Sequence, residues 1–264
     1  VQEFQFGMNW SSYSRFVGDI FGAPLAMEGL LAFFLESTFL GLWIFGWDRL
    51  PKKLHLASIW AASFGTVFSA YFILAANAWM QHPVGYVYNT KTGRAELKSI
   101  ATVLTQKTAL ATFLHTIPSA VLTAGALFAG VAGWMLLKGR DPEVAKPVLK
   151  AGLITVVISF LIVGVSGDFT ARVMTKQQPM KMAAAEALFD SKPSAPFSLF
   201  TIGSLDGSHA VFQIGIPSLL SLMSTGKTNG VVEGVNDLEK QYNAKYGKDS
   251  YTPVIWLAYW SFRL

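Results

Sequence analysis

Two glutamates stand inside a stretch that is otherwise apolar enough to cross a membrane. Glu28 and Glu36 both lie within residues 22–47, where nearly every other side chain is apolar or small. A carboxylate at bilayer depth costs about 2.5–3.5 kcal/mol on insertion scales. We therefore expect both to be used, for proton movement, for ion passage or for tuning a buried cofactor.

The spacing of the two glutamates allows them to act together. On a regular α-helix, residues eight apart lie about 80° apart around the axis and about 12 Å apart along it. Both can then face one cavity at different depths, as a proton relay requires. The alternative is a structural role, with each carboxylate held by a basic or backbone partner. Ser37 and Ser69 can extend a hydrogen-bonded chain, although serines in spans also commonly bond backbone carbonyls.

His115 is the histidine best placed to bind a cofactor. It lies within the apolar stretch 108–137, with Pro118 following it in the chain. Neutral imidazole is a common haem ligand, and the interiors of helix bundles are usual cofactor sites. The alternative is a packing histidine bonded to a neighbouring carbonyl, and the sequence leaves both interpretations open.

Three further charged residues are weaker candidates for a functional role. Asp48 follows the first apolar stretch, where it is either an interfacial anchor or a proton entrance. Lys181 and Glu186 lie in a predicted helix over 180–189, since Ala, Met, Lys and Glu favour helix. Their spacing of five is poor for an intrahelical ion pair, so they are either solvated or part of a site for a polar headgroup.

These residues must be positioned by membrane helices. The chain has 264 residues, of which 52% are hydrophobic and 14% are charged, whereas soluble domains carry about 25% charged residues. Its net charge of +5 does not indicate a nucleic-acid partner, because the basic residues flank apolar runs. With no cysteine, the chain has no disulfide, zinc-thiolate site, iron–sulfur cluster or cysteine-linked haem. Four stretches reach the length of about 20 residues that a span needs: 22–47, 54–80, 108–137 and 147–167.

The connections predict an orientation and a domain organisation. The short basic connections 47–53 and 138–146 are expected in the cytoplasm, which puts the loop 81–107 and the segment after the fourth span outside. We predict an all-α, polytopic transmembrane bundle over 1–168 and a long extracytoplasmic loop over 169–252 with a polar helix over 235–247. Residues 253–264 would begin a further span, because twelve residues reach only about 18 Å. Since the chain starts at Val1 and stops within this apolar run, it is expected to be an internal piece of a longer protein.

Several runs of residues resemble a known family over essentially the whole chain. The run from Gly18 to Leu50 is similar to the core of subunit I of the cytochrome bd ubiquinol oxidases. Further matches, in the family's order and spacing, are EFQFGMNW (3–10), LAANAWMQHP (74–83), FLHT (113–116), WMLLKGRD (134–141) and KMAAAE (181–186).

The resemblance implies a function and residue roles that hydropathy alone does not. The family oxidises ubiquinol or menaquinol and reduces dioxygen to water with two b haems, one low-spin and one high-spin, and a haem d or a third haem b. By this resemblance, His115 matches the axial ligand of the low-spin haem b iron, and Asn77 and Arg263 match residues near the haems. Glu28 and Glu36 match the carboxylates beside the high-spin haems, and Ser37, Ser69 and Asp48 match the proton path. Lys181 and Glu186 match the quinol site of the outer "Q loop".

The resemblance also implies partners, a location and missing parts. A second subunit, and in some members a small accessory subunit, completes the oxidase in the bacterial cytoplasmic (inner) membrane, with membrane lipid around it and the Q loop on the outer face. The family's methionine ligand follows the position of Leu264, and a histidine and a glutamate ligand lie in other helices outside the chain. The alternative function is a cofactor-free proton- or ion-coupled transporter, because intramembrane acids suit both.

Overall fold

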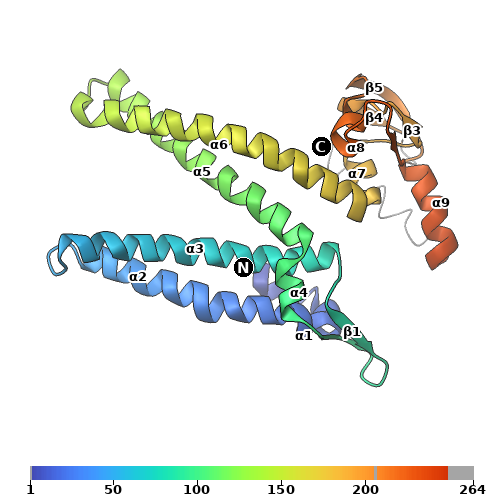
Figure 1. Ribbon diagram of the computed structural model, residues 1–264, viewed down its shortest axis with the longest axis horizontal. Helices are drawn as coiled ribbons and strands as arrows, with labels where there is room; N and C mark the ends of the chain where they lie inside the picture. Colours follow the sequence, from blue (N-terminus) through green and yellow to red (C-terminus); the bar gives the residue numbers. More distant parts are fainter. Residues whose placement is uncertain (1, 205–206, 249–264) are drawn as a thin grey trace. The chain divides into compact units, whose positions relative to one another are not determined.

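The fold is mostly helical, with small two-stranded sheets in the connections (Figure 1). The computed structural model describes residues 2–204 and 207–248. The chain divides into two compact units, one ending at Val163 and one beginning at Gly164. Each is described by itself.

The first unit contains the helices that reach membrane length. The first of these is one continuous helical run made of α1 (Ser11–Met27), the π-helical segment η2 (Glu28–Phe33) and α2 (Phe34–Phe45), preceded by the 3₁₀ segment η1 (Gln2–Gly7). It is followed by α3 (Lys52–Gln81), α5 (Lys107–Leu137) and α6 (Pro142–Gln177), the last of which crosses into the second unit. Within the described residues, four helical runs are therefore long and apolar enough to cross a membrane. The predicted fold class is confirmed.

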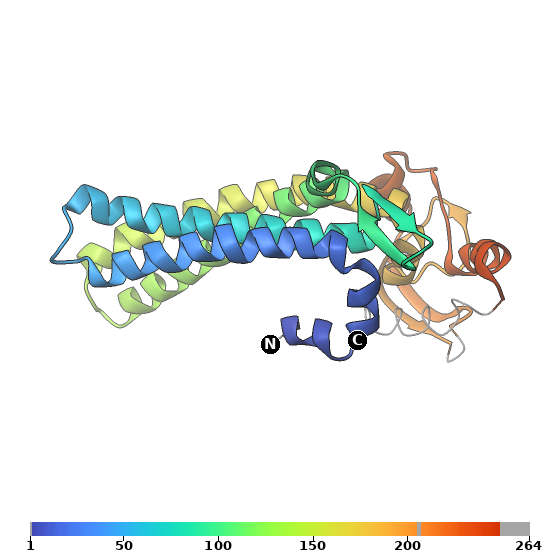
Figure 2. The ribbon, with the colours of Figure 1, turned by 90° about the horizontal axis from the view of Figure 1, so that it is seen from below.

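The helices pack through small residues that let their backbones approach closely. Figures 1 and 2 show α2 running beside α3 and α5 beside α6. A Cβ added to Gly65 on α3 would lie 2.8 Å from Glu36 N and 3.0 Å from Ala32 O. A Cβ added to Gly152 on α6 would lie 2.8 Å from Ala129 N on α5. Small residues at such contacts are what membrane helices use in place of a hydrophobic driving force.

A short hairpin closes the end of the unit where α1 begins. Strands β1 (Tyr86–Asn89) and β2 (Arg94–Leu97) pair antiparallel, with Tyr86 opposite Leu97, and α4 (Ile100–Thr105) follows. The buried core at this end joins α1, α3, the hairpin and α4 through Val17, Ile20, Phe21, Ala76, Trp79, Ala95 and Val103. Trp79 Nε1 also donates to Val84 O at 2.9 Å, which fixes the chain as it leaves α3.

The second unit is a folded loop domain rather than an open connection. It contains α7 (Pro179–Ala185), α8 (Leu219–Thr225), α9 (Val235–Tyr246), the hairpin of β4 (Phe197–Gly203) with β5 (Ala210–Ile216), and a short pairing of β3 (Lys192–Pro193) with β6 (Val231–Val232). Buried Ser221 ties its segments together: the Oγ accepts from Ala195 N at 2.7 Å and donates to Gly230 O at 2.6 Å.

The helices differ in their bounds from the predicted spans. The helical run begins at Ser11 rather than at residue 22, and the fourth helix continues to Gln177 rather than stopping at 167. Hydropathy detects only the apolar part of a helix, whereas polar turns can continue it. The ion pair of Arg172 Nε with Asp168 Oδ2 at 2.9 Å, four residues apart, supports the polar extension of α6. The predicted helix over 180–189 ends instead at Ala185, and Ala187 has a φ of 51°.

The described residues include strands that were not predicted, and some predictions concern residues outside the described ranges. The three sheets were not predicted, although Tyr86–Asn89 and Phe197–Gly203 are rich in β-formers. The division into 1–168, 169–252 and 253–264 stays a prediction. Arg263 and the predicted start of a further span lie outside the described residues.

Candidate functional site

The site is built around Glu28, where the first helical run departs from regular α-helix. Glu28 is the first residue of the π-helical segment η2 and is half-buried. Ser69 on α3 donates from Oγ to Glu28 Oε1 at 2.7 Å. One carboxylate oxygen of Glu28 is therefore held by the neighbouring helix. Single π-turns within α-helices occur frequently at functional sites.

The π-turn changes the angle between the two glutamates around the helix axis. A π-turn accommodates one residue more than an α-turn, which sets the following residues back by about 100°. The rotation of about 80° expected for residues eight apart on a regular helix is thereby reduced to about 20°. Glu28 and Glu36 thus lie on nearly the same face, the face toward α3.

Contacts with α3 agree with this alignment. Glu28 meets Ser69, and the backbone of Glu36 meets Gly65, one turn earlier on the same face of α3. Glu36 is half-buried in the first turn of α2, and Gly65 is buried. The Glu28 carboxylate and the Glu36 backbone therefore both lie at the contact of the first helical run with α3. That the two carboxylates face one cavity at different depths stays a prediction.

The other predicted proton-path residues are placed less directly. Ser37 is exposed and donates to Phe34 O of its own helix at 3.3 Å. Asp48 is exposed in the turn after α2, and among the described residues it has no hydrogen bond or ion pair. The structure thus joins Ser69 to Glu28 but does not join Ser37 or Asp48 to either glutamate.

His55, which the sequence analysis did not select, lies where α2 ends and α3 begins. His55 Nε2 lies 2.8 Å from Trp43 O, one of the last carbonyls of α2, which lack an intrahelical partner. The imidazole stacks on Trp43 and packs against Trp47 at a ring-centroid distance of 4.6 Å. The signal in the sequence was a histidine one turn into a span that follows two tryptophans.

His115 lies on α5, half-buried, where α5 is fixed against α3. Tyr71 on α3 donates to Leu104 O at 2.8 Å and meets Phe113 edge-on at 5.2 Å. Ser119 Oγ donates to His115 O at 2.7 Å, close to Pro118, which cannot donate from its own nitrogen.

The surroundings of His115 fit one axial ligand of a haem. An imidazole is a suitable donor, and the neighbouring α5 side chains are apolar and exposed, with Leu110 42% and Leu114 56% accessible. A flat apolar macrocycle or a further helix would cover them. Within the described residues no three His, Asp or Glu side chains gather into a metal-ion site.

Asn77 and the Lys181–Glu186 pair complete the predicted set. Asn77 is exposed on α3 and accepts from Gln81 Nε2 at 2.6 Å. In the second unit, Lys181 lies on α7 and Glu186 caps the C-terminus of that helix, donating from its backbone N to Met182 O at 3.0 Å. Both are half-buried beside the buried residues Met182–Ala184. They are held by one short element.

The fold and the site define a class. This is a bundle of helices of membrane-spanning length with two carboxylates inside one span and a histidine on another, and the chain continues into a second folded unit. A family model described as Cytochrome bd terminal oxidase subunit I matches residues 1–264. The chain belongs to this family.

Named relatives agree with the family. The chain is 45% identical over 265 residues to cytochrome bd ubiquinol oxidase subunit 1 of Bacillus subtilis, covering 100% of this chain and 56% of that protein. It is 40% identical to cytochrome bd-II ubiquinol oxidase subunit 1 of Escherichia coli, covering 90% of this chain and 46% of that protein. The chain thus spans about half the length of these relatives.

A solved structure agrees in fold. The bd oxidase from Geobacillus thermodenitrificans superposes with a TM-score of 0.76 at 26% identity, covering 95% of this chain and 60% of that one. The helical arrangement described above is therefore that of an oxidase subunit.

Proposed function

We propose that the full-length protein is the haem-binding subunit of a terminal quinol oxidase, which oxidises membrane quinol and reduces dioxygen to water with protons taken from the cytoplasm. The observation that carries this proposal is the contact of Ser69 with Glu28 at the π-turn. It holds a carboxylate between two spans, a costly placement that proton transfer explains. Family membership supplies the reaction class.

Glu28 and Glu36 take up and pass protons in this proposal. Their shared face and different depths suit sequential transfer, and Ser69 orients Glu28 by donating to one oxygen while the other can carry the proton. Asp48, exposed at the end of the run, is the proposed entrance, and Ser37 is a proposed side contributor. A cytoplasmic entrance agrees with the basic connections on that side.

His115 is the proposed axial ligand of the low-spin haem b iron, with Asn77 and Arg263 near the haems. When bound, the haems (low-spin b, high-spin b, and d or a third b) supply electron transfer and oxygen reduction. The role of this chain is to hold the imidazole on α5, which packs against Tyr71 through Phe113, and to deliver protons through the glutamates.

Lys181 and Glu186 are the proposed contacts for the quinol headgroup, ubiquinol or menaquinol. The Lys181 ammonium can donate a hydrogen bond to a quinol hydroxyl, and the Glu186 carboxylate can accept one from it. Lys181→Ala or Glu186→Ala should raise the apparent KM for quinol while haem content stays intact. Loss of haem content would instead assign the pair a structural role.

The proposed setting is the bacterial cytoplasmic membrane, with the Q loop outside. Subunit II is the proposed partner, with a small accessory subunit in addition. Exposed apolar side chains along the spans, such as Leu127 at 64%, are the surface that such partners and lipid would cover.

The test is a spectrum and a rate on the full-length complex. Reduced-minus-oxidised spectra should contain haem Soret and α bands, and their absence would favour the cofactor-free transporter. Glu28→Gln and Glu36→Gln should each lower quinol-driven oxygen consumption about 100-fold, the usual contribution of a positioned proton donor, with haem content retained. Glu143→Gln, at an exposed acid outside the spans, is the matched control and should leave the rate unchanged. Equal rates in all three variants would overturn the proton-path assignment.

A further inference from the structure

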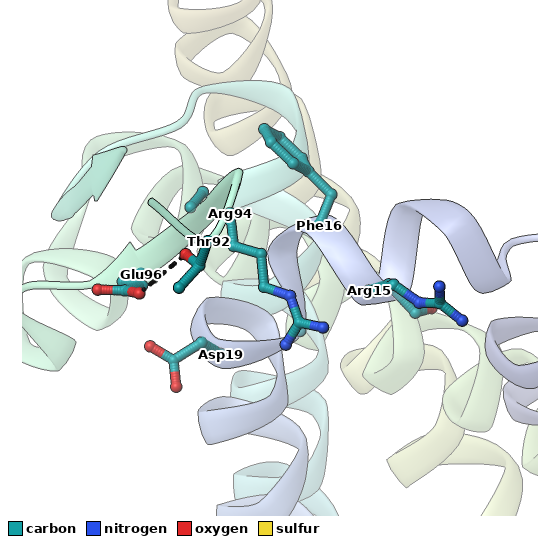
Figure 3. Close-up of a pocket in the computed structure, with 9 residues that line it drawn as sticks. Arg15, Phe16, Asp19, Thr92, Arg94 and Glu96 are labelled. Atoms are coloured by element: carbon teal, nitrogen blue, oxygen red, sulfur yellow. Dashed lines mark hydrogen bonds between the residues drawn. The ribbon is translucent and has the colours of Figure 1, made fainter. Parts of the chain in front are cut away.

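A charged pocket that the proposed function does not use lies between the start of α1 and the β1–β2 hairpin. Its volume is about 440 Å³ (Figure 3). The polar and aromatic residues that line it are Ser14, Arg15, Phe16, Asp19, Thr92, Arg94 and Glu96. All belong to the first unit, so the pocket is formed within one compact body.

The two carboxylates of the pocket are held in place by the hairpin. Asp19 Oδ2 accepts from Leu97 N at 2.8 Å. Glu96 Oε1 accepts from Asn89 Nδ2 at 2.7 Å and from Thr92 Oγ1 at 3.3 Å, the latter drawn in Figure 3. The second oxygen of each carboxylate receives no hydrogen bond from the described residues. Each acid is therefore oriented and still able to accept from a ligand.

The arginine donors of the pocket have no partner within residues 2–204 and 207–248. Among the described residues, neither Arg15 nor Arg94 makes an ion pair or a side-chain hydrogen bond. Figure 3 shows the Arg94 side chain reaching down beside Asp19 rather than turning toward Glu96. The buried Ser14 Oγ, on the pocket lining, also has no hydrogen-bond partner there. A buried hydroxyl without a partner is costly, which favours a ligand that accepts from it.

The pocket lies where phospholipid headgroups are found. Asp19 precedes the apolar stretch that starts at residue 22 by about 4.5 Å of helix at 1.5 Å per residue. The headgroup region of each leaflet extends about 5–7 Å beyond the hydrocarbon core. Phe16 and Tyr88, with ring centroids 6.2 Å apart, are both exposed, as interfacial aromatic residues are.

The charge balance of the lining selects among headgroups. Two arginines and two acids give a formal charge of +2 − 2 = 0. A headgroup with only negative charge would bring its phosphate to the arginines but face Asp19 and Glu96 without a cation. A headgroup with a phosphate and a primary ammonium satisfies both, whereas a quaternary ammonium has no N–H to donate.

We propose that this pocket binds the headgroup of a zwitterionic phospholipid with a primary ammonium, of the phosphatidylethanolamine class. Arg15, Arg94 and Ser14 hold the phosphate, and Asp19 and Glu96 accept from the ammonium. The acyl chains enter the bilayer beside α1.

The test is lipid retention by the full-length complex, measured by native mass spectrometry after delipidation and re-addition of one lipid. Phosphatidylethanolamine should bind about tenfold more tightly than phosphatidylglycerol or phosphatidylcholine of the same chains. Glu96→Gln, which removes one charged acceptor for the ammonium, should weaken this preference, whereas Glu143→Gln, at an exposed acid outside the pocket, should keep it. Equal retention of the three lipids, or an unchanged preference in Glu96→Gln, would overturn the proposal.

Soluble phosphoethanolamine separates a lipid from a free metabolite with the same polar chemistry. It should displace the lipid only at much higher concentration, because it lacks the acyl chains. Displacement at equal concentration would overturn the lipid assignment and make the pocket a site for a soluble phosphoamine.

Discussion

Ser69 is the residue through which the second span acts on Glu28. Its hydroxyl holds one carboxylate oxygen at 2.7 Å, whereas the neighbouring Ser63 bonds only to Ile59 O of its own helix. The same residue type thus has two roles on one helix, an interhelical contact and a backbone contact. Only the interhelical contact can influence how Glu28 exchanges a proton.

Ser69→Ala should slow quinol-driven oxygen consumption about fivefold, because the lost hydrogen bond contributes about 1 kcal/mol and that energy corresponds to about fivefold in rate. Ser69→Thr, which keeps the hydroxyl, should restore most of the rate, and haem content should not change in either variant. Ser63→Ala is the control on the same helix. A rate in Ser69→Ala equal to that of Ser63→Ala would contradict the positioning role.

Asp237 gives the second unit a dependence on pH. Ser191 donates to this carboxylate, its backbone N lying 3.1 Å from Oδ2, and Lys240 Nζ lies 3.6 Å from Oδ1. These hydrogen bonds from Ser191, followed by the charge of Lys240, lower the pKa of Asp237 from its ordinary value of 3.8. Because the folded pKa is lowered, the stabilisation is complete above 3.8 and is lost as pH falls through the folded value.

Asp237→Asn should therefore weaken the protection of α9 amides from hydrogen exchange at neutral pH. The difference from the parent protein should shrink once the pH is below the lowered pKa, since the protonated carboxyl group of the parent is then neutral, like the amide of the variant. Glu143→Gln, at an exposed acid outside α9, serves as the control. A difference that is the same at both pH values would show that the charge of Asp237 is not responsible.

At the scale of the element, Gly65 sets how closely α3 approaches the first helical run. The positions at which an added Cβ would lie are filled by backbone atoms of Ala32 and Glu36, which cannot move aside as a side chain can. By contrast, an added Cβ at Gly41, on the same run, has no atom within 4 Å. The two glycines differ in packing although both lie in apolar helix.

Gly65→Ala should destabilise the detergent-solubilised complex by about 1–3 kcal/mol, the usual cost of overpacking, and lower the oxidase rate by displacing Glu36. Gly41→Ala should be neutral or slightly stabilising, because alanine is the better helix former. Thermal unfolding monitored by haem absorbance measures both. Equal melting temperatures would contradict the close approach.

The elements differ in how far the sequence predicts them. The second and third spans agree with α3 and α5 to within two residues, because apolar runs mark those helices. The polar ends of α1 and α6 were missed, since they are continued by local ion pairs and by packing rather than by hydropathy. The π-turn at Glu28 was also missed, because the contact that it serves, with Ser69, is 41 residues away in sequence. The two glutamates were expected to face one cavity, but the π-turn that brings them onto nearly the same face has no signal in the local sequence.

At the scale of the whole molecule, the topology follows from the basic connections and remains to be measured. The chain has no cysteine, so single cysteines can report the side of the membrane in a cysteine-free full-length protein. Thr228 and Lys53 are both exposed; Thr228 belongs to the second unit, and Lys53 lies at the start of α3, in the short basic connection that is predicted to be cytoplasmic. They are matched positions for such a measurement.

Thr228→Cys should react with a membrane-impermeant maleimide in intact cells, whereas Lys53→Cys should react only after permeabilisation. The reason is the concentration of lysine and arginine in the short connections on the inner side. Labelling of Lys53→Cys from outside, with Thr228→Cys protected, would invert the orientation and place the proton entrance on the wrong side.

The π-turn also has a genetic consequence. The run from Ser11 to Phe45 contains one residue more than an uninterrupted α-helix with the same facing residues would need. Deletion of a single codon within Gly29–Phe33 would remove that extra residue, so Glu28 and Glu36 would be seven residues apart on a regular α-helix and would still lie about 20° apart around its axis. A gap of one position in this segment should therefore be tolerated better than a gap elsewhere in the span, where no extra residue can be lost without rotating one part of the helix relative to the other.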